Sequence, residues 1–250
     1  MNPVFSEKIF RNSATTANQA DVMTVKGTLM KSLLLLIMVI AGAAYTWKIF
    51  YESTDPLSVK GWMIGGLIVG FILAMIISFV PKYAPFLSPI YAAAEGLALG
   101  GISAMYNNLF AQTAPNIVMN AVGLTLLCTL VMLLIYRTGI VKVNGTFMKV
   151  MTIALTTILI YYLGIIILSL FGVNLSMLTG NTPLSIGISI IIVGVAAFSL
   201  LMDFNFIEKA SEQGAPKYME WYGAFGLMVT LVWLYLEILK LLAKFAGSRN

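Results

Sequence analysis

Long blocks of apolar residues, separated by short polar segments, dominate the pattern along the chain. Each block is about 20 residues long, which is the length that an α-helix needs to cross the roughly 30 Å hydrocarbon core of a bilayer. Transmembrane β-strands would instead alternate polar and apolar residues, and the blocks show no such alternation. The pattern therefore predicts an all-α polytopic membrane protein.

About seven blocks are long enough to be spans, so we expect a polar tail at residues 1–26 and a seven-helix transmembrane domain at residues 27–250. The tail is too long and polar for a secretory signal, and we expect it to stay on the protein, with an amphipathic piece around Val4–Ile9. Pro85 and Pro89 predict an irregular start for the third span, because proline disturbs a helix. The expected spans are residues 32–50, 61–80, 86–105, 114–136, 146–171, 183–206 and 219–245.

The distribution of Lys and Arg predicts the orientation, because these residues accumulate in cytoplasmic loops. With the amino terminus inside, the outer loops hold only Lys48 and Lys60. We therefore expect a cytoplasmic amino terminus; a last block that re-enters without crossing would place both termini there. We also expect an uncharged loop at Asn107 and Asn108, and a long helical hairpin turn at Glu208–Lys217 between the last two spans.

Composition narrows the function. Hydrophobic residues make up 60% of the chain and charged residues 10%, whereas about a quarter of the residues of a soluble domain are charged. The net charge is +5, but the basic residues are scattered, which does not favour nucleic-acid binding. The chain has no His and one Cys, which excludes His-based triads, imidazole zinc sites and an internal disulfide.

Catalytic motifs are also missing from the sequence. Intramembrane proteolysis by an acid pair would be compatible with Asp203 and a second acid, but no motif supports it. Serine chemistry lacks an evident base, and no glycine loop is present to cradle a phosphate. We therefore expect no enzyme activity and no cofactor.

Glycines recur at helical spacing in two of the blocks. Gly96 and Gly100 form a small-xxx-small pattern in the third span, and Gly65, Gly66 and Gly70 form another in the second. Such patterns let two helices approach closely in lipid. The expected role is packing inside the bundle.

Three of the ten acidic residues lie within apolar blocks, namely Glu95, Asp203 and Glu237. A charged side chain at the centre of a bilayer costs about 2.5–3.5 kcal/mol on insertion scales, so each is a candidate functional residue. Each also has a structural alternative as an interfacial acid, and Glu237 has a further one as the partner of Lys240 three residues later. Asn205 is a supporting polar residue two positions after Asp203.

Carboxyl groups in such surroundings have specific chemistry. Burial favours the neutral form, and two neighbouring carboxylates share a proton and titrate as a unit. Such a pair could switch near neutral pH between a proton-bridged, closed form and a charged, repelling form. Hard cations prefer oxygen ligands, and acidic groups in a pore favour cations. The residues therefore suggest a cation pathway gated by protonation.

The segment Leu201–Ala210, LMDFNFIEKA, resembles the sixth-span motif of the Bax inhibitor-1 family (transmembrane Bax inhibitor motif proteins), in particular its YetJ-like bacterial branch. Glu95–Gly100 looks like the third-span segment of that family. Leu234–Leu242 looks like the final-span stretch, in which an Asp usually stands at the position of Glu237. The likeness covers most of the chain.

The resemblance implies a seven-helix bundle with a central last helix in a bacterial inner membrane. It also implies a pH-sensitive calcium leak controlled by Asp203 and Glu237, with calcium as the ion that they would bind and pass. A YccA-like member of the family is linked to a membrane-bound quality-control protease. The alternative is therefore a regulator without transport activity, whose tail at residues 1–26 engages such a protease. A secondary transporter would show broken helices in repeated halves, and the sequence shows none.

Overall fold

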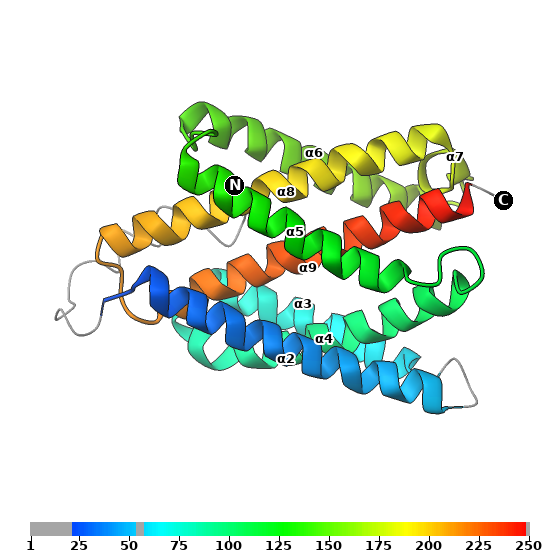
Figure 1. Cartoon of the computed structure of the whole chain (residues 1–250), viewed down its shortest axis with the longest axis horizontal. Coiled ribbons are helices and arrows are strands. Elements are labelled where there is room, and N and C mark those ends of the chain that lie inside the picture. The colour runs from blue at the N-terminus through cyan, green and yellow to red at the C-terminus, as the bar shows by residue number, and fades with distance from the viewer. Residues whose placement is uncertain (1–21, 54–57, 249–250) are drawn as a thin grey trace. The chain divides into compact units, whose positions relative to one another are not determined.

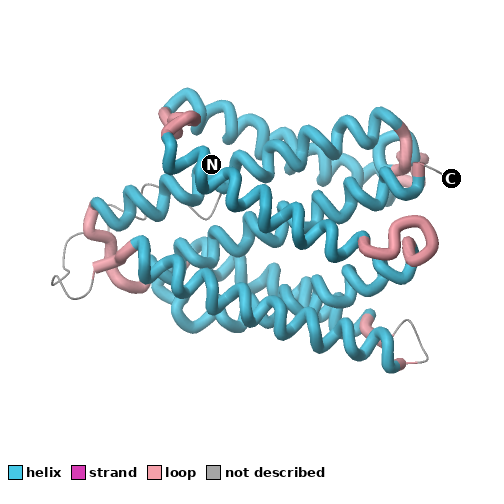
Figure 2. The backbone as a smooth tube through the Cα atoms, viewed as in Figure 1, coloured by secondary structure: helices cyan, strands magenta, loops and turns pink. Residues whose placement is uncertain are grey.

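The computed structural model describes residues 22–53 and 58–248 of the 250-residue chain, and these are almost entirely helical (Figures 1 and 2). Within the described ranges, no β-strand is formed and the one extended pairing is an isolated antiparallel bridge between Val22 and Pro216. The α-helices and one 3-10 helix (η2) are, in chain order, α2 (Val25–Glu52), α3 (Lys60–Phe79), η2 (Pro81–Tyr83), α4 (Ala84–Leu109), α5 (Ile117–Thr138), α6 (Gly145–Leu170), α7 (Ser176–Thr179), α8 (Pro183–Glu212) and α9 (Met219–Gly247).

Six of these helices, α2, α3, α5, α6, α8 and α9, are long and apolar enough to cross a membrane. They coincide with six of the seven predicted spans. The remaining predicted span, residues 86–105, lies inside α4, which has 26 residues but carries many Ala, Gly and Ser residues. The prediction of an all-α polytopic membrane protein is confirmed.

Burial differs strongly among the six helices. In the 18-residue apolar stretch of α9, 56% of the residues are buried inside the protein, which is the largest share among the six helices. In the corresponding stretch of α6, the share is 6%.

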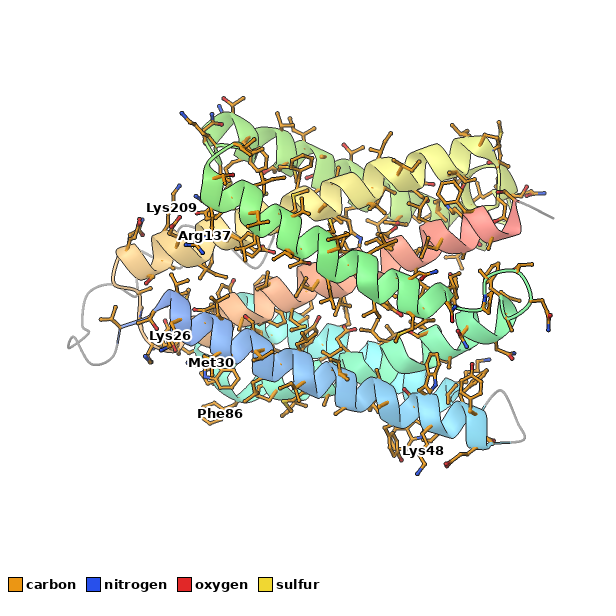
Figure 3. The ribbon with its side chains drawn as sticks, viewed as in Figure 1. Lys26, Met30, Lys48, Phe86, Arg137 and Lys209 are labelled. Atoms are coloured by element: carbon orange, nitrogen blue, oxygen red, sulfur yellow. The ribbon has the colours of Figure 1, made fainter. Side chains whose placement is uncertain are left out.

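Helix α2 begins earlier than predicted, inside the expected tail. Thr24 is its N-cap, and the Thr24 hydroxyl accepts a hydrogen bond from the backbone N–H of Gly27 at 3.0 Å, which satisfies one of the free N–H groups of the first turn. Lys26 and Lys48 lie near opposite ends of α2 (Figure 3). They are 22 positions apart, which corresponds to roughly 33 Å of helix, about one hydrocarbon core. The predicted amphipathic piece at Val4–Ile9 lies outside the described residues.

The expected irregular start of the third span is confined to the turn η2. Helix α4 begins at Ala84 and runs through both Pro85 and Pro89. Pro85 occupies the first turn, where the backbone N–H has no partner within the helix. Pro89 lies in the second turn and removes one helical hydrogen bond, the one to the carbonyl group of Pro85. The helix continues through both prolines at the cost of this one bond near its start.

Two predicted loops are wrong, because the helices extend into them. Asn107 lies in the last turn of α4, and its side-chain amide donates to the Tyr51 hydroxyl at 2.7 Å. Helix α8 continues to Glu212, so Glu208 belongs to the helix and not to a hairpin turn. Residues 207–213 contain neither Gly nor Pro, so nothing in this part of the sequence interrupts the helix. Gly214, two residues after the end of α8, has a φ of 69°, a conformation that glycine adopts readily and that does not continue an α-helix.

The described chain divides into two compact units. The first comprises residues 109–202 and 230–248, and therefore α5, α6, α7, the first part of α8 and the last part of α9. The second comprises the described residues of 22–108 together with 203–229, and therefore α2, α3, α4, the end of α8 and the start of α9.

Small residues bring α4 close to α2 and α3 in the second unit (Figure 1). A Cβ atom at Gly96 would collide with the carbonyl oxygen of Val39 on α2, and one at Gly66 would collide with that of Ala94 on α4. At Gly65 a Cβ atom would meet nothing within 4 Å. The predicted packing role is therefore confirmed at Gly96 and Gly66, and Gly65 is not part of this contact.

Replacing Gly96 with Ala should lower the free energy of unfolding by about 1–3 kcal/mol, because the added methyl group must push α2 and α4 apart. The matched control is Gly65→Ala, which adds the same methyl group in open space. Reversible unfolding in mixed detergent micelles measures both. Equal stability of the two variants would contradict the close approach of α2 and α4.

Candidate functional site

Glu237 lies in the first unit at the centre of a small hydrogen-bonded cluster. Its side chain is 2% exposed. The Tyr162 hydroxyl of α6 donates to Glu237 Oε1 at 2.8 Å, and Lys240 Nζ, one turn later on α9, lies 2.9 Å from the same oxygen. The Lys240 ammonium also lies 5.0 Å from the centre of the Tyr162 ring. The Glu237–Lys240 ion pair, which the sequence analysis gave as the structural alternative, is thus present. The hydrogen bond from Tyr162 was not predicted.

Lys244 extends this polar region and was missed by the sequence reasoning. Its ammonium donates to the hydroxyls of Ser185 and Ser189 on α8, each at 2.7 Å, and to the carbonyl oxygen of Ser185 at 3.3 Å. Both serines are buried. Their spacing of four residues places them on one helical face, which is the signal that could have indicated a partner.

The last turns of α9 therefore carry one carboxylate and two ammonium groups, a sum of +1 from Glu237, Lys240 and Lys244. The negative charge of Glu237 already has a cation beside it. A calcium ion that binds Glu237 must therefore compete with Lys240. We infer that this cluster fixes the side chain of Glu237 in place.

Asp203 lies in the second unit, on α8, and is 1% exposed. The helix beyond it stays buried on one face, at Phe204, Ile207 and Ala210. Asn205 is half-buried. Asp203 is therefore buried inside the protein.

Glu95 is half-buried on α4 in the second unit. The hydroxyl of Tyr91, one turn earlier, donates a hydrogen bond to its carboxyl group. A Cβ atom at Gly70 of α3 would lie 2.9 Å from Glu95 Oε1, so the glycine gives the carboxyl group its space. The Tyr91 ring packs edge-on against Phe225 of α9, with ring centres 4.9 Å apart, which fixes the tyrosine.

Glu220 in the first turn of α9 is a further acid, which the sequence analysis did not single out as a candidate functional residue. Its side chain is fully buried, with 0% exposed. It accepts hydrogen bonds from the backbone N–H and the hydroxyl of Thr24, both at 2.9 Å. It also pairs with Lys31 of α2 and, at 3.1 Å, with Lys217. A Cβ atom at Gly27 would collide with this carboxylate.

Metal coordination by clustered side chains is not seen in the described ranges, which contain no group of three or more His, Cys, Asp or Glu residues that could hold an ion. Calcium takes six to eight oxygen ligands. A calcium ion at Asp203 or Glu237 would therefore take most of its ligands from water, hydroxyl groups or backbone carbonyl groups.

Comparison with known protein families matches the chain to the family described as Bax inhibitor 1 like, over residues 2–247. The comparisons with curated proteins and with solved structures found no significant match. The family match covers nearly the whole chain and includes every helix described above.

Replacing Lys240 with Met should lower the free energy of unfolding by about 1–3 kcal/mol, because buried Glu237 then loses a charge-assisted hydrogen bond. Lys48→Met is the matched control, since the Lys48–Glu52 pair is largely exposed at both partners and is expected to contribute little. Unfolding in mixed micelles measures both variants. The double variant Lys240→Met/Glu237→Gln should recover part of the loss. Equal losses for Lys240→Met and Lys48→Met would contradict the buried ion pair.

Proposed function

The chain belongs to the Bax inhibitor 1 like family and is an integral multi-pass membrane protein, and we propose that it forms a calcium leak pathway whose conduction depends on pH through Asp203 and Glu237. One observation carries the proposal. Two of the six helices that are apolar enough to cross a membrane each hold a carboxyl group that is almost fully buried, with Asp203 1% exposed and Glu237 2% exposed. Carboxyl groups at such positions are expensive and have a functional explanation by default.

The two acids have different roles in this proposal. Glu237 keeps Lys240 and Tyr162 as partners and supplies a fixed charge. Asp203 is the group whose protonation changes with pH. In its charged form it attracts cations and is repelled by other carboxylates, and in its neutral form it does neither. Glu95 contributes a third carboxyl group along the pathway.

Orientation is part of the proposal. The lysine distribution supports a cytoplasmic amino terminus in a bacterial inner membrane. Lys26 at the start of α2 and Lys82 just after α3 would then lie on the cytoplasmic side.

The alternative function, regulation of a membrane-bound protease without transport, depends on the tail at residues 1–26. Only residues 22–26 of this tail lie within the described chain. The contacts of these residues are internal, to Glu220 and to the α8–α9 turn. The flux experiment below tests this alternative, which predicts that the protein passes no calcium.

Calcium flux into dye-loaded proteoliposomes should be larger at about pH 8 than at about pH 6, because the ionised carboxylates attract the cation. Asp203→Asn should lower the flux at high pH and abolish its pH dependence. Glu237→Gln should lower the flux but keep the pH dependence, since Glu237 supplies a fixed charge. Glu208→Gln, which removes an exposed acid five residues along the same helix, is the matched control and should behave like the wild type.

Three results would go against the proposal. Flux with unchanged pH dependence in Asp203→Asn would remove Asp203 from the gate. An equal effect of Glu208→Gln would show that surface charge, and not the buried carboxyl group, is responsible. The absence of flux at either pH would contradict the leak and favour the protease regulator.

A further inference from the structure

The segment Val22–Thr24, directly before α2, is attached to the turn that joins α8 and α9 (Figure 1). The Met23 N–H donates to the carbonyl oxygen of Ala215 at 2.7 Å, and Val22 forms the antiparallel bridge with Pro216. The Ser211 hydroxyl on the last turn of α8 donates to the Met23 carbonyl oxygen at 3.2 Å. The Met23 side chain is 1% exposed. This segment thus contacts the end of α8 and the following turn at several points.

Glu220 connects the same segment to the first turn of α9. Its carboxylate accepts two hydrogen bonds from Thr24 and pairs with Lys31 and Lys217. Among the described residues, Glu220 is the one carboxylate that the structure pairs with either lysine. Lys31 also lies over the Trp221 ring, 5.5 Å from its centre. Removal of the charge of Glu220 would therefore leave Lys31 and Lys217 without this carboxylate partner and would weaken the two hydrogen bonds from Thr24.

We propose that Glu220 is a positioning residue that locks the amino-terminal segment onto the α8–α9 turn, and that release of this lock accompanies opening of the pathway. The second half of this statement rests on the proposed function. Glu220 is not among the site residues predicted from the sequence, and it has no role in the proposed control of conduction by Asp203 and Glu237. The lock provides a role for this buried carboxylate.

The connection to Asp203 runs through one continuous helix. Asp203 and Ser211 both lie on α8 and in the same unit, eight residues or about 12 Å of helix apart. Because a helix moves nearly as a rigid body over this length, a change at Ser211 and the turn is transmitted to Asp203. While the lock holds, the end of α8 cannot shift relative to α2, since the last turn of α8, the turn itself and the first turn of α9 are all bound to residues 22–31.

Amide hydrogen exchange tests the lock itself, without any need for flux. In Glu220→Gln the amides of Met23 and Thr24 should exchange about tenfold faster or more, because hydrogen bonds to a charged group are among the strong ones. The matched control is Glu212→Gln, which removes an exposed negative charge at the end of α8 and should leave both amides unchanged. Unchanged exchange in Glu220→Gln, or equal acceleration in both variants, would overturn the lock.

A disulfide tests the coupling to opening, and it does so in a protein whose ion pairs are intact. Directly opposed residues of an antiparallel bridge have the Cα separation that a disulfide needs. The pair Val22→Cys and Pro216→Cys, with the native Cys128 replaced by Ser, therefore closes the lock covalently on oxidation. In proteoliposomes at about pH 8, oxidation should lower calcium flux by about tenfold, and reduction should restore it. Val22→Cys alone, in the same background, should respond to neither treatment.

Hydrogen exchange tests the lock, and calcium flux tests its coupling to opening, so the two measurements can fail independently. Flux in the oxidised protein equal to that in the reduced protein would overturn the coupling, even if the exchange experiment supports the lock. If the wild type passes no calcium, the proposed function and the coupling both fail, and the exchange data alone decide whether Glu220 is a lock.

Discussion

The constraint on which the structure depends is that a charge buried among apolar helices needs a partner. A carboxylate or an ammonium group loses its hydration there, and an unpartnered one is strongly destabilising. The protein meets this demand locally, with short-range pairs on the same helix or on a neighbouring one within the same unit. Glu237 has Lys240 and Tyr162, and Glu220 has Lys31 and two groups of Thr24. These pairs fix the side chains of Glu237 and Glu220.

Small residues of α4 and of the helices beside it also help to accommodate polar groups among the apolar helices. In lipid, helices gain little from excluding water, so close backbone approach and satisfied polar groups stabilise their contacts. Gly96 brings α4 against α2, and Gly70 on α3 leaves room for the carboxyl group of Glu95. The result is a helix that is less apolar than its neighbours but more deeply packed. The same residues lower the mean hydropathy of α4, which is therefore not among the six helices that are long and apolar enough to cross a membrane.

The sequence predicts the helical segments, and it offers the Glu237–Lys240 pair as a structural alternative, because both depend on local pattern. Block length determines where helices lie, and residues three apart share a helical face. The role of Glu220 could not be predicted in this way, since its partner Lys31 is 189 residues away in the chain. Lys244 was missed for the same reason. The continuation of α4 through Pro89 removes only one hydrogen bond near the start of the helix, which the simple rule against helical proline does not consider.

The central claim is that Asp203 changes its protonation state near neutral pH. The most direct measurement is the carboxyl C=O stretch of the reconstituted protein, recorded by infrared difference spectroscopy between about pH 8 and about pH 6. The account predicts a band of a protonated carboxyl group that grows as the pH falls and that is missing in Asp203→Asn. Identical difference spectra for the wild type and Asp203→Asn would contradict it.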